Sequence, residues 1–205
     1  MKIIRWKRLI ITCLVCLLPI ILGVALFDKL PQQIAIHFDI HNNPDNFASK
    51  EFTVFGIPVL MALLQVICCF IYGINAKKHG ERPKLERVVT WIIPVMCIIL
   101  QTVTLAYSLD FNIDIRRVAG FIVGTIFIVL GNVTPKLDYV KNHDVSTDKA
   151  RKINRFIGYE SVTMGVLFMA SLLLPPITTI VCIFLLIPYA IIGAVYGIKV
   201  GRSKS

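Results

Sequence analysis

Two histidines four residues apart, His37 and His41, stand with Asp39 and Asp45 in the most metal-like cluster of this chain. Imidazole and carboxylate groups are common zinc ligands, but two histidines at this spacing share a metal only where the segment is helical. The residues that follow, Asn42-Asn43-Pro44-Asp45, are typical of a turn and disfavour that helix. We therefore expect a folded polar loop with no metal, and metal binding is the alternative.

The sequence carries no recognisable catalytic set. It has neither the His-Glu-x-x-His pattern of zinc proteases nor the Glu-Glu-x-x-x-Arg pattern of the glutamate-based CAAX-type membrane proteases. All six cysteines lie inside apolar runs, where the reactive thiolate form is disfavoured. Cys13-x-x-Cys16 is therefore interpreted as a pair of packed neutral thiols rather than a redox or metal pair. We expect a protein that is not an enzyme and that needs no cofactor.

Gln65 and Gln101 are the deepest strongly polar side chains of the apolar runs. No clearly ionisable residue lies in the interior of those runs, and Glu160 stands only near the start of one. Transporters usually need buried ionisable groups along their pathway. We expect the two glutamines to hydrogen-bond to each other across a helix pair, which is a structural role. A role in binding a transported substrate is the alternative.

Six apolar runs of about 17 to 22 residues provide the elements that position these side chains. Their approximate bounds are 9–27, 55–74, 88–109, 116–134, 157–174 and 177–198. A helix rises about 1.5 Å per residue, so each run is long enough to cross the hydrocarbon layer of a bilayer. The hydrophobic fraction of 56% and the mean hydropathy of +0.75 exclude an ordinary soluble domain. The sequence predicts an all-α integral membrane protein, a bundle of six transmembrane helices.

Basic residues occupy alternate gaps between the runs. The N-terminus, the gaps 75–87 and 135–156 and the C-terminal tail hold 18 of the 22 Lys and Arg residues. Positive residues stay on the cytoplasmic side of a membrane, so both termini are predicted to lie inside. The net charge of +10 is thereby explained by topology and by contact with anionic lipids. Direct nucleic-acid binding is disfavoured because no stacking aromatic residues accompany the basic loops.

The chain is predicted to form a single membrane domain over residues 1–205. Its one long outer loop, 28–54, lies opposite the inner basic loops 75–87 and 135–156. Small faces at Gly120-x-x-x-Gly124, Gly193-x-x-x-Gly197 and Gly197-x-x-x-Gly201 allow close helix approach. We expect packing within the bundle, and a homodimer is the alternative.

The outer loop carries the first of two family-like motifs. It reads Leu30-Pro31, then Ile34, Ile36 and Phe38 alternating with polar residues as in a short strand, then Asn43-Pro44-Asp45, then Ser49-Lys50. This loop resembles that of the SdpI-like family, immunity proteins for a sporulation-delaying peptide toxin. Asn42 or Asn43 replaces the turn glycine of the family, and asparagine also accepts left-handed backbone angles.

The second motif follows the fourth apolar run. Gly131-Asn132-Val-Thr-Pro135-Lys136 and, after a loop, Asn154-Arg155-Phe156-Ile157-Gly158 resemble the Gly-Asn-x-x-Pro-Lys and His-Arg-Phe-x-Gly elements of the same family. The Arg-Thr-Pro-Trp segment usual between them is missing. From the residues alone, Asn132 is expected to satisfy terminal carbonyls of its helix, Pro135 to end the helix, and Lys136 to face the helix dipole and anionic headgroups.

The resemblance implies an immunity protein that binds a hydrophobic or amphipathic antimicrobial peptide at the outer membrane face. The outer-loop candidates for that contact are His37, Asp39, His41, Asp45 and Lys50. In the family, toxin-bound immunity protein can also recruit a transcriptional repressor to the membrane. The cytoplasmic candidates for such signalling are Gly131, Asn132, Pro135, Lys136, Asn154 and Arg155. A small peptide or lipid transporter is the alternative, and an intramembrane enzyme is a third.

Overall fold

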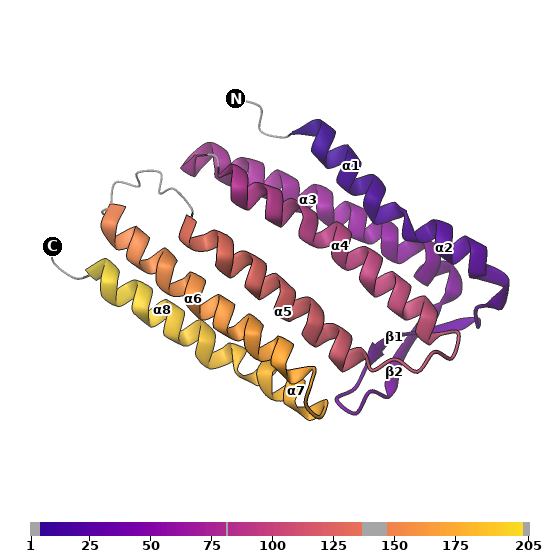
Figure 1. Ribbon diagram of the computed structural model, residues 1–205. Coiled ribbons are helices and arrows are strands. Elements are labelled where there is room, and N and C mark those ends of the chain that lie inside the picture. The colour runs from indigo at the N-terminus through magenta and orange to yellow at the C-terminus, as the bar shows by residue number, and fades with distance from the viewer. Residues whose placement is uncertain (1–4, 81, 137–146, 203–205) are drawn as a thin grey trace. The chain divides into compact units, whose positions relative to one another are not determined.

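The computed structural model describes residues 5–80, 82–136 and 147–202. Within these residues the chain forms long helices and a single two-stranded sheet (Figure 1). The helices, with their bounds, are α1 (Trp6–Leu17), α2 (Pro19–Leu26), α3 (Ile57–His79), α4 (Pro83–Tyr107), α5 (Ile115–Val133), α6 (Thr147–Ser171), α7 (Ile177–Phe184) and α8 (Leu186–Arg202). The strands are β1 (Gln33–Phe38) and β2 (Pro44–Ser49), and short turns lie at η1 (Phe27–Lys29), η2 (Phe52–Gly56) and η3 (Thr134–Lys136).

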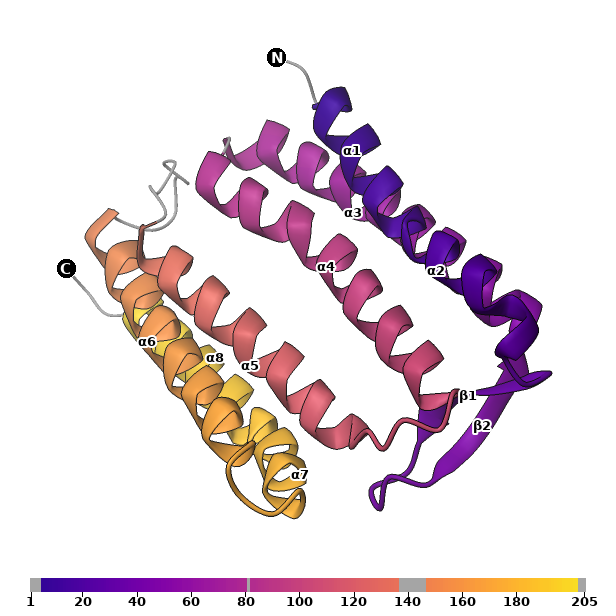
Figure 2. The ribbon, with the colours of Figure 1, turned by 45° about the vertical axis from the view of Figure 1, so that its right-hand side comes forward.

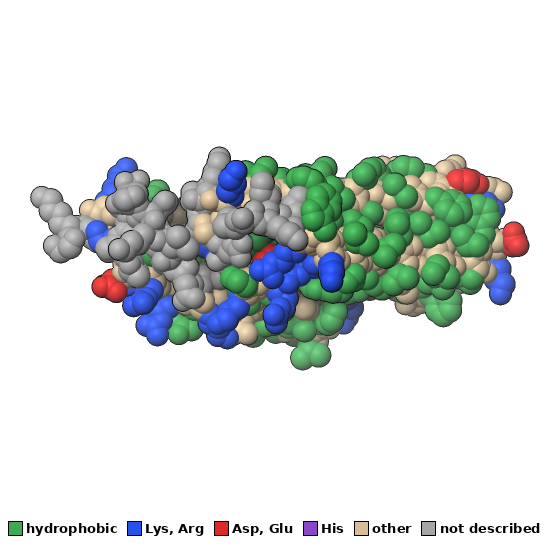
Figure 3. All heavy atoms as spheres, turned by 90° about the horizontal axis from the view of Figure 1, so that it is seen from above, with side chains coloured by type: hydrophobic (Ala, Val, Ile, Leu, Met, Phe, Trp, Pro, Cys, Tyr) green, Lys and Arg blue, Asp and Glu red, His purple; other side chains and the backbone are tan. Residues whose placement is uncertain are grey.

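Five helical segments of the described residues are long and apolar enough to cross a membrane. They are Trp6–Lys29, Phe52–Lys77, Pro83–Tyr107, Ile115–Lys136 and Ile177–Arg202. Hydrophobic side chains predominate over much of the face shown in Figure 3, as expected for groups that contact lipid. The prediction of an all-α multi-pass membrane protein with a small strand pair is therefore confirmed.

The sixth predicted span, 157–174, falls in α6 but does not reach the same hydropathy. α6 begins at Thr147, well before the apolar run, and its first half carries Lys149, Arg151, Lys152 and Arg155. Its apolar residues are concentrated in its second half. The sixth crossing and the inside placement of both termini stay predictions.

Two compact units make up the chain, one of Met1–Lys77 with Val89–Ile115 and the other of Lys78–Val88 with Arg116–Ser205. In the first unit, the sheet lies at the end where α2 and α4 finish (Figures 1 and 2). A core of Leu30, Ile34, Val54 and Leu105 joins it to those helix ends. The hairpin, defined here as residues 33–49, is thus packed onto its helices and does not hang free.

The hairpin has an irregular register. β1 and β2 pair antiparallel, and shifts occur between Ala35 and His37 and between His37 and Phe38. A bulge turns successive side chains away from strict alternation. Ile34 and Ala35 lie in the regular part of the register and are both buried, whereas Ile36, at the first shift, is exposed. The expected strand is present, but the alternation of Ile34, Ile36 and Phe38 on a single face is wrong.

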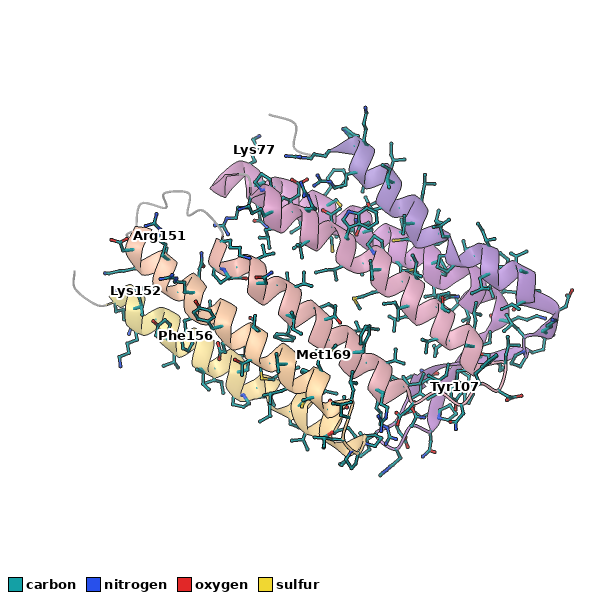
Figure 4. All side chains as sticks on the ribbon, viewed as in Figure 1. Lys77, Tyr107, Arg151, Lys152, Phe156 and Met169 are labelled. Carbon is teal, nitrogen blue, oxygen red and sulfur yellow. The ribbon has the colours of Figure 1, made fainter. Side chains whose placement is uncertain are left out.

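In the second unit, α6 and α8 lie antiparallel. The rings of Phe156 and Tyr196 stack with centroids 3.9 Å apart, and the hydroxyls of Ser161 and Tyr189 are 2.8 Å apart. Figure 4 shows Phe156 on the side of α6 that adjoins α8. The α6–α7 turn at Pro175-Pro176 is closed by a hydrogen bond from the hydroxyl of Thr178 to the carbonyl of Ser171, 3.2 Å long.

The glycine faces divide between packed and open positions. A Cβ on Gly120 would lie 2.8 Å from the methyl carbon of Thr179, and one on Gly124 would lie 3.1 Å from the carbonyl oxygen of Gly165. These two glycines therefore serve packing inside the second unit, as expected. Gly197 and Gly201 on α8 have nothing within 4 Å of that position.

Candidate functional site

His37 and Asp45 face each other across the hairpin. His37 lies in β1 and Asp45 lies in β2, and the imidazole Nδ1 is 2.5 Å from the carboxylate Oδ1. Both side chains remain open to solvent, with 67% and 45% of their surface exposed. The sequence placed these residues in one loop, and the fold brings them into direct contact. The pair offers an incoming molecule both a hydrogen-bond donor and an anionic acceptor.

Asp39 organises the turn between the strands. Its Oδ1 accepts hydrogen bonds from the backbone N–H groups of His41 and Asn43, each 2.8 Å long, and its Oδ2 accepts one of 3.1 Å from the Asn43 side chain. The N–H of Asn43 is the main cause that lowers the pKa of the Asp39 carboxyl below its ordinary value. The charged form of Asp39 therefore stabilises the turn. His41 contributes its backbone to this arrangement and leaves its side chain exposed.

Asn42 has the left-handed backbone that its position requires. Its φ is 69°, as expected where asparagine replaces a turn glycine. Its side chain also makes two hydrogen bonds that the sequence did not indicate. The amide Nδ2 donates to the carbonyl of Ile113 at 3.3 Å, and Oδ1 accepts from the N–H of Ile115 at 2.8 Å. The tip of the hairpin is thereby tied to the segment that follows α4.

Two aromatic contacts attach the remaining parts of the hairpin. Phe38 meets Tyr107, at the end of α4, edge to face with ring centroids 4.7 Å apart. Figure 4 shows Tyr107 at the hairpin end of that helix. The ammonium of Lys50 lies 4.4 Å from the centre of the Phe27 ring, which is a cation–π contact. Lys50 therefore supports the base of the hairpin and does not extend into solvent.

The hairpin and its neighbouring segment also expose large apolar side chains. Ile40, Phe47 and Phe111 each expose more than half of their surface. Acidic groups accompany them at Asp39, Asp45 and Asp110. Exposed apolar and acidic groups together suit contact with an amphipathic molecule or with the membrane interface.

The two histidines of the hairpin lie in different kinds of backbone structure. His37 lies in a strand and His41 in a turn, so they do not have the helical spacing at which both could reach one ion. Across residues 5–80, 82–136 and 147–202, no three His, Cys, Asp or Glu side chains converge as metal ligands.

Gln101 binds backbone rather than the other glutamine. Its Nε2 donates to the carbonyl of Thr53 at 2.7 Å, and both residues are buried. Thr53 lies in the π-helical turn η2, where the N–H of Ile57 donates to the carbonyl of Phe52. The next donor along the chain would be residue 58, but Pro58 has no N–H. Gln101 thus supplies a hydrogen bond that the proline cannot make.

Gln65, on α3, likewise donates its side-chain amide to a backbone carbonyl of α4. Its Nε2 donates to the carbonyl of Thr90 at 2.9 Å, and Thr90 is the residue whose α-helical donor would be Pro94. The same nitrogen also donates to the hydroxyl of Thr12 on α1 at 3.0 Å. Gln65 Oε1 is buried and has no hydrogen-bond partner among the described residues.

The expected bond between the two glutamines is therefore wrong. α3 and α4 are antiparallel, so Gln65 lies level with Thr90 and Gln101 lies level with Thr53. Eleven residues of α4 separate Thr90 from Gln101, which is about 16 Å of helix. Each glutamine instead donates to a backbone carbonyl whose helical donor position is occupied by a proline. Bilayer helices use such donors to satisfy freed backbone groups. Both amide donors serve the fold, which supports the structural interpretation over a substrate path.

The second motif brings its two halves together. A Cβ on Gly158 would lie 2.3 Å from Cγ of Pro135, and a Cβ on Gly131 would lie 2.7 Å from the carbonyl oxygen of Gly158. Only glycine allows α5 with η3 to approach α6 this closely. The two halves of the motif therefore form one packing contact. One half is Gly-Asn-x-x-Pro at the end of α5, and the other is the glycine of Asn-Arg-Phe-x-Gly in α6.

The polar members of that motif lie on the outside of the contact. Lys136 Nζ donates to Oδ1 of Asn132 at 2.8 Å, so these two residues of the motif are joined to each other. Asn154 is half-buried and Arg155 is exposed. Because Phe156 stacks on Tyr196, the start of α6 and the end of α8 lie at the same end of their pair. Exposed basic residues meet there: Arg151, Lys152, Arg155, Lys199 and Arg202.

Sequence reasoning missed the supports of the hairpin. Neither Thr53 nor Tyr107 was singled out, and Asn42 was named only for its backbone. One signal was available for Thr53: a buried glutamine together with a helix-interior proline indicates that a carbonyl needs a donor. No sequence signal points from Asn42 to Ile115, because their contact depends on how the chain returns.

Two comparisons with known proteins bear on this arrangement. Residues 14–62 match the family described as "Domain of unknown function (DUF1648)". This match covers most of the first helical span, the whole hairpin and the start of α3. The chain is also 29% identical over 126 residues to "Immunity protein SdpI" of Bacillus subtilis (strain 168). The aligned part is 62% of this chain and 59% of that relative, so it covers less than two thirds of the relative's length.

The resemblance to the SdpI-like family, which two short motifs indicated, is confirmed by these matches. The match to residues 14–62 includes the hairpin, whereas the second motif at 131–158 lies beyond it. No solved structure matches the chain.

Proposed function

We propose that this SdpI-like membrane protein is an immunity protein of the bacterial cytoplasmic membrane. It protects the cell that makes it from a hydrophobic or amphipathic antimicrobial peptide. The peptide binds at the hairpin, on the outer side of the membrane, and is kept from inserting or assembling elsewhere. This task requires binding and no covalent chemistry.

The observation that carries the proposal is the hairpin itself. It is held by a buried core, by the Asn42 bridge and by the Phe38–Tyr107 contact, yet it exposes His37, Asp45 and large apolar side chains. A rigid support lowers the entropic cost of binding because the site is already ordered. Its exposed apolar groups suit the apolar face of a peptide, and its acidic groups suit a cationic face. The similarity to the immunity protein SdpI of Bacillus subtilis supports the same function.

The test is protection of a sensitive cell. The full chain is produced in a bacterium that is killed by the secreted peptide encoded near the gene, and survival is measured against peptide concentration. We expect the native chain to raise the concentration needed for killing. Unchanged killing by every such peptide would refute the immunity role.

Variants locate the contact. His37→Ala and Asp45→Ala are expected to lower protection, because each removes one of the exposed polar groups of the hairpin. Asp28→Ala is the matched control, since Asp28 is an exposed acid in η1 of the same unit but outside the hairpin. Protein levels in the membrane are compared for all three. Equal losses for the control and the hairpin variants would contradict binding at the hairpin.

A second role, recruitment of a cytoplasmic transcriptional repressor, is favoured by one observation. The Phe156–Tyr196 stack gathers exposed Lys and Arg residues of α6 and α8 into one basic surface. An acidic protein surface would complement that charge. A fluorescent fusion of a repressor encoded beside the gene should move to the membrane when peptide is added. Arg151→Gln with Lys152→Gln should weaken this movement while protection persists, and movement without this protein would refute the role.

A further inference from the structure

We infer that Gln101 is a positioning residue for the hairpin, although it lies on α4, outside the hairpin. It acts through Thr53, by donating to the carbonyl that Pro58 leaves without a helical donor. The order of the hairpin then depends on a buried hydrogen bond from a neighbouring helix as well as on its own core and contacts. As a statement about hairpin order this inference is independent of the proposed function, and as a statement about protection it rests on that function.

The hydrogen bonds of the π-helical turn η2 differ from those of an α-helix. The N–H of Ile57 would donate to Thr53 in α-helical spacing, but it donates to Phe52 instead. In the wider spacing of the turn the donor to Thr53 would be residue 58, which is proline. The carbonyl of Thr53 is therefore left without a donor from its own helix, and Gln101 Nε2 provides one at 2.7 Å.

Both residues of this hydrogen bond are buried. Thr53 has 0% of its surface exposed and Gln101 has 2%. Water therefore cannot replace the glutamine as donor while this packing persists. A buried carbonyl without a partner is strongly unfavourable, so removal of the amide should cause η2 to rearrange.

Hydrogen bonds and core packing connect η2 to the hairpin. Ser49, the last residue of β2, accepts a hydrogen bond of 3.0 Å from the Thr53 hydroxyl through its carbonyl. The Ser49 hydroxyl accepts a second bond of 3.2 Å from the N–H of Phe52. Val54, also in η2, packs in the core with Ile34 of β1. A rearrangement of η2 therefore reaches both strands.

Gln65 provides a matched control within the same protein. It is equally buried, and it donates to a carbonyl beside a proline at 2.9 Å. Its acceptor, Thr90, lies far along α4 from the hairpin. A general loss of helix packing should follow from either glutamine, whereas loss of hairpin order should follow from Gln101 alone.

The experiment compares hydrogen–deuterium exchange of the full chain in lipid nanodiscs for Gln101→Met and Gln65→Met. Methionine has a similar length and no N–H donor. We expect the backbone amides of β1 and β2 to exchange about tenfold faster in Gln101→Met, the effect of losing one buried hydrogen bond. In Gln65→Met those amides should exchange at the native rate. Equal rates in the two variants would overturn the inference.

Rescue separates the carbonyl-donor role from simple packing. Pro58→Ala returns an N–H to the turn, so Gln101→Met should then change hairpin exchange less than about threefold. An undiminished effect in that background would refute the role of Pro58 and with it the inference. The same comparison at Gln65, with Pro94→Ala, should leave hairpin exchange unchanged.

Protection assays distinguish this inference from the proposed function. If Gln101→Met loosens the hairpin and also lowers protection, both are supported. If the hairpin loosens and protection persists, the positioning role is upheld and binding at the hairpin is refuted. If the hairpin exchanges at the native rate, the positioning role is refuted whatever the protection.

Discussion

The side chain of Asn42 accepts a hydrogen bond from the backbone N–H of Ile115 at 2.8 Å, across 73 positions of sequence. The same amide donates to the carbonyl of Ile113. Both bonds depend on a φ of 69° at Asn42, a backbone that asparagine tolerates better than most residues. One residue therefore combines the turn of the hairpin with its attachment to the chain beyond α4.

Substitutions at Asn42 should separate these two roles. Asn42→Gly keeps the backbone and loses both bonds, so we expect it to destabilise the hairpin by about 1–2 kcal/mol. Asn42→Ala also strains the backbone and should cost about 1 kcal/mol more. Exchange of hairpin amides measures both. An alanine variant as stable as the glycine variant would show that the positive φ is not maintained.

Asp39 makes the turn sensitive to acid. Hydrogen bonds from Asn43 and His41 lower the pKa of Asp39 below its ordinary value of 3.8, so the carboxylate stabilises the folded turn. That contribution is fully present above the ordinary value and is lost as the pH falls through the lower folded-state pKa. We expect hairpin exchange, corrected for its intrinsic pH dependence, to rise below about pH 4.

Asp39→Asn is the control for this pH dependence. The amide can still accept hydrogen bonds but does not titrate in this range, so the acid-induced step should disappear. A step that persists in the variant would assign the acid sensitivity to another group.

The hairpin shows how far local patterns reach. The alternation of apolar and polar residues predicted a strand, and the Asn-Pro-Asp segment predicted a turn after it, because both depend on neighbouring residues. The strand is present, but the chain turns at Asp39–Asn43, and Pro44 and Asp45 already lie in β2. The bulge between Ala35 and His37 was not predictable. The packing of Ile34 with Val54 and Leu105 was not predictable either, because those two residues lie outside the local pattern.

The glutamines show the same limit inside the membrane. Their depth and the lack of ionisable residues in the apolar runs predicted a structural role, and the hydrogen bonds to Thr53 and Thr90 support that interpretation. Their hydrogen-bond partners depend on how α3 and α4 are aligned along their lengths, and the sequence does not show that alignment. Pro58 and Pro94 each occupy the position of a helical donor, and a glutamine donates to the carbonyl concerned.

Exchanging His37 and Asp45 should tell a binding pair from a purely structural one. The pair is largely exposed, so loss of either partner should cost less than about 1 kcal/mol of hairpin stability. His37→Asp with Asp45→His keeps the pair and should restore that stability. We expect protection to stay low in the exchanged variant, because a bound peptide would meet each group in the wrong place. Full recovery of protection in the survival assay would assign the pair a structural role alone.

Gly158 should tolerate no side chain, because Pro135 occupies the space. A Cβ there would lie 2.3 Å from Pro135 Cγ, so Gly158→Ala must push η3 away from α6. We expect a loss of about 1–3 kcal/mol in the free energy of unfolding, typical of overpacking. Gly197→Ala is the matched control, because nothing lies within 4 Å of its Cβ position and alanine favours the helix by up to about 1 kcal/mol. Denaturant unfolding of the two purified variants in detergent gives the comparison, and equal stabilities would contradict the close approach of Pro135 to α6.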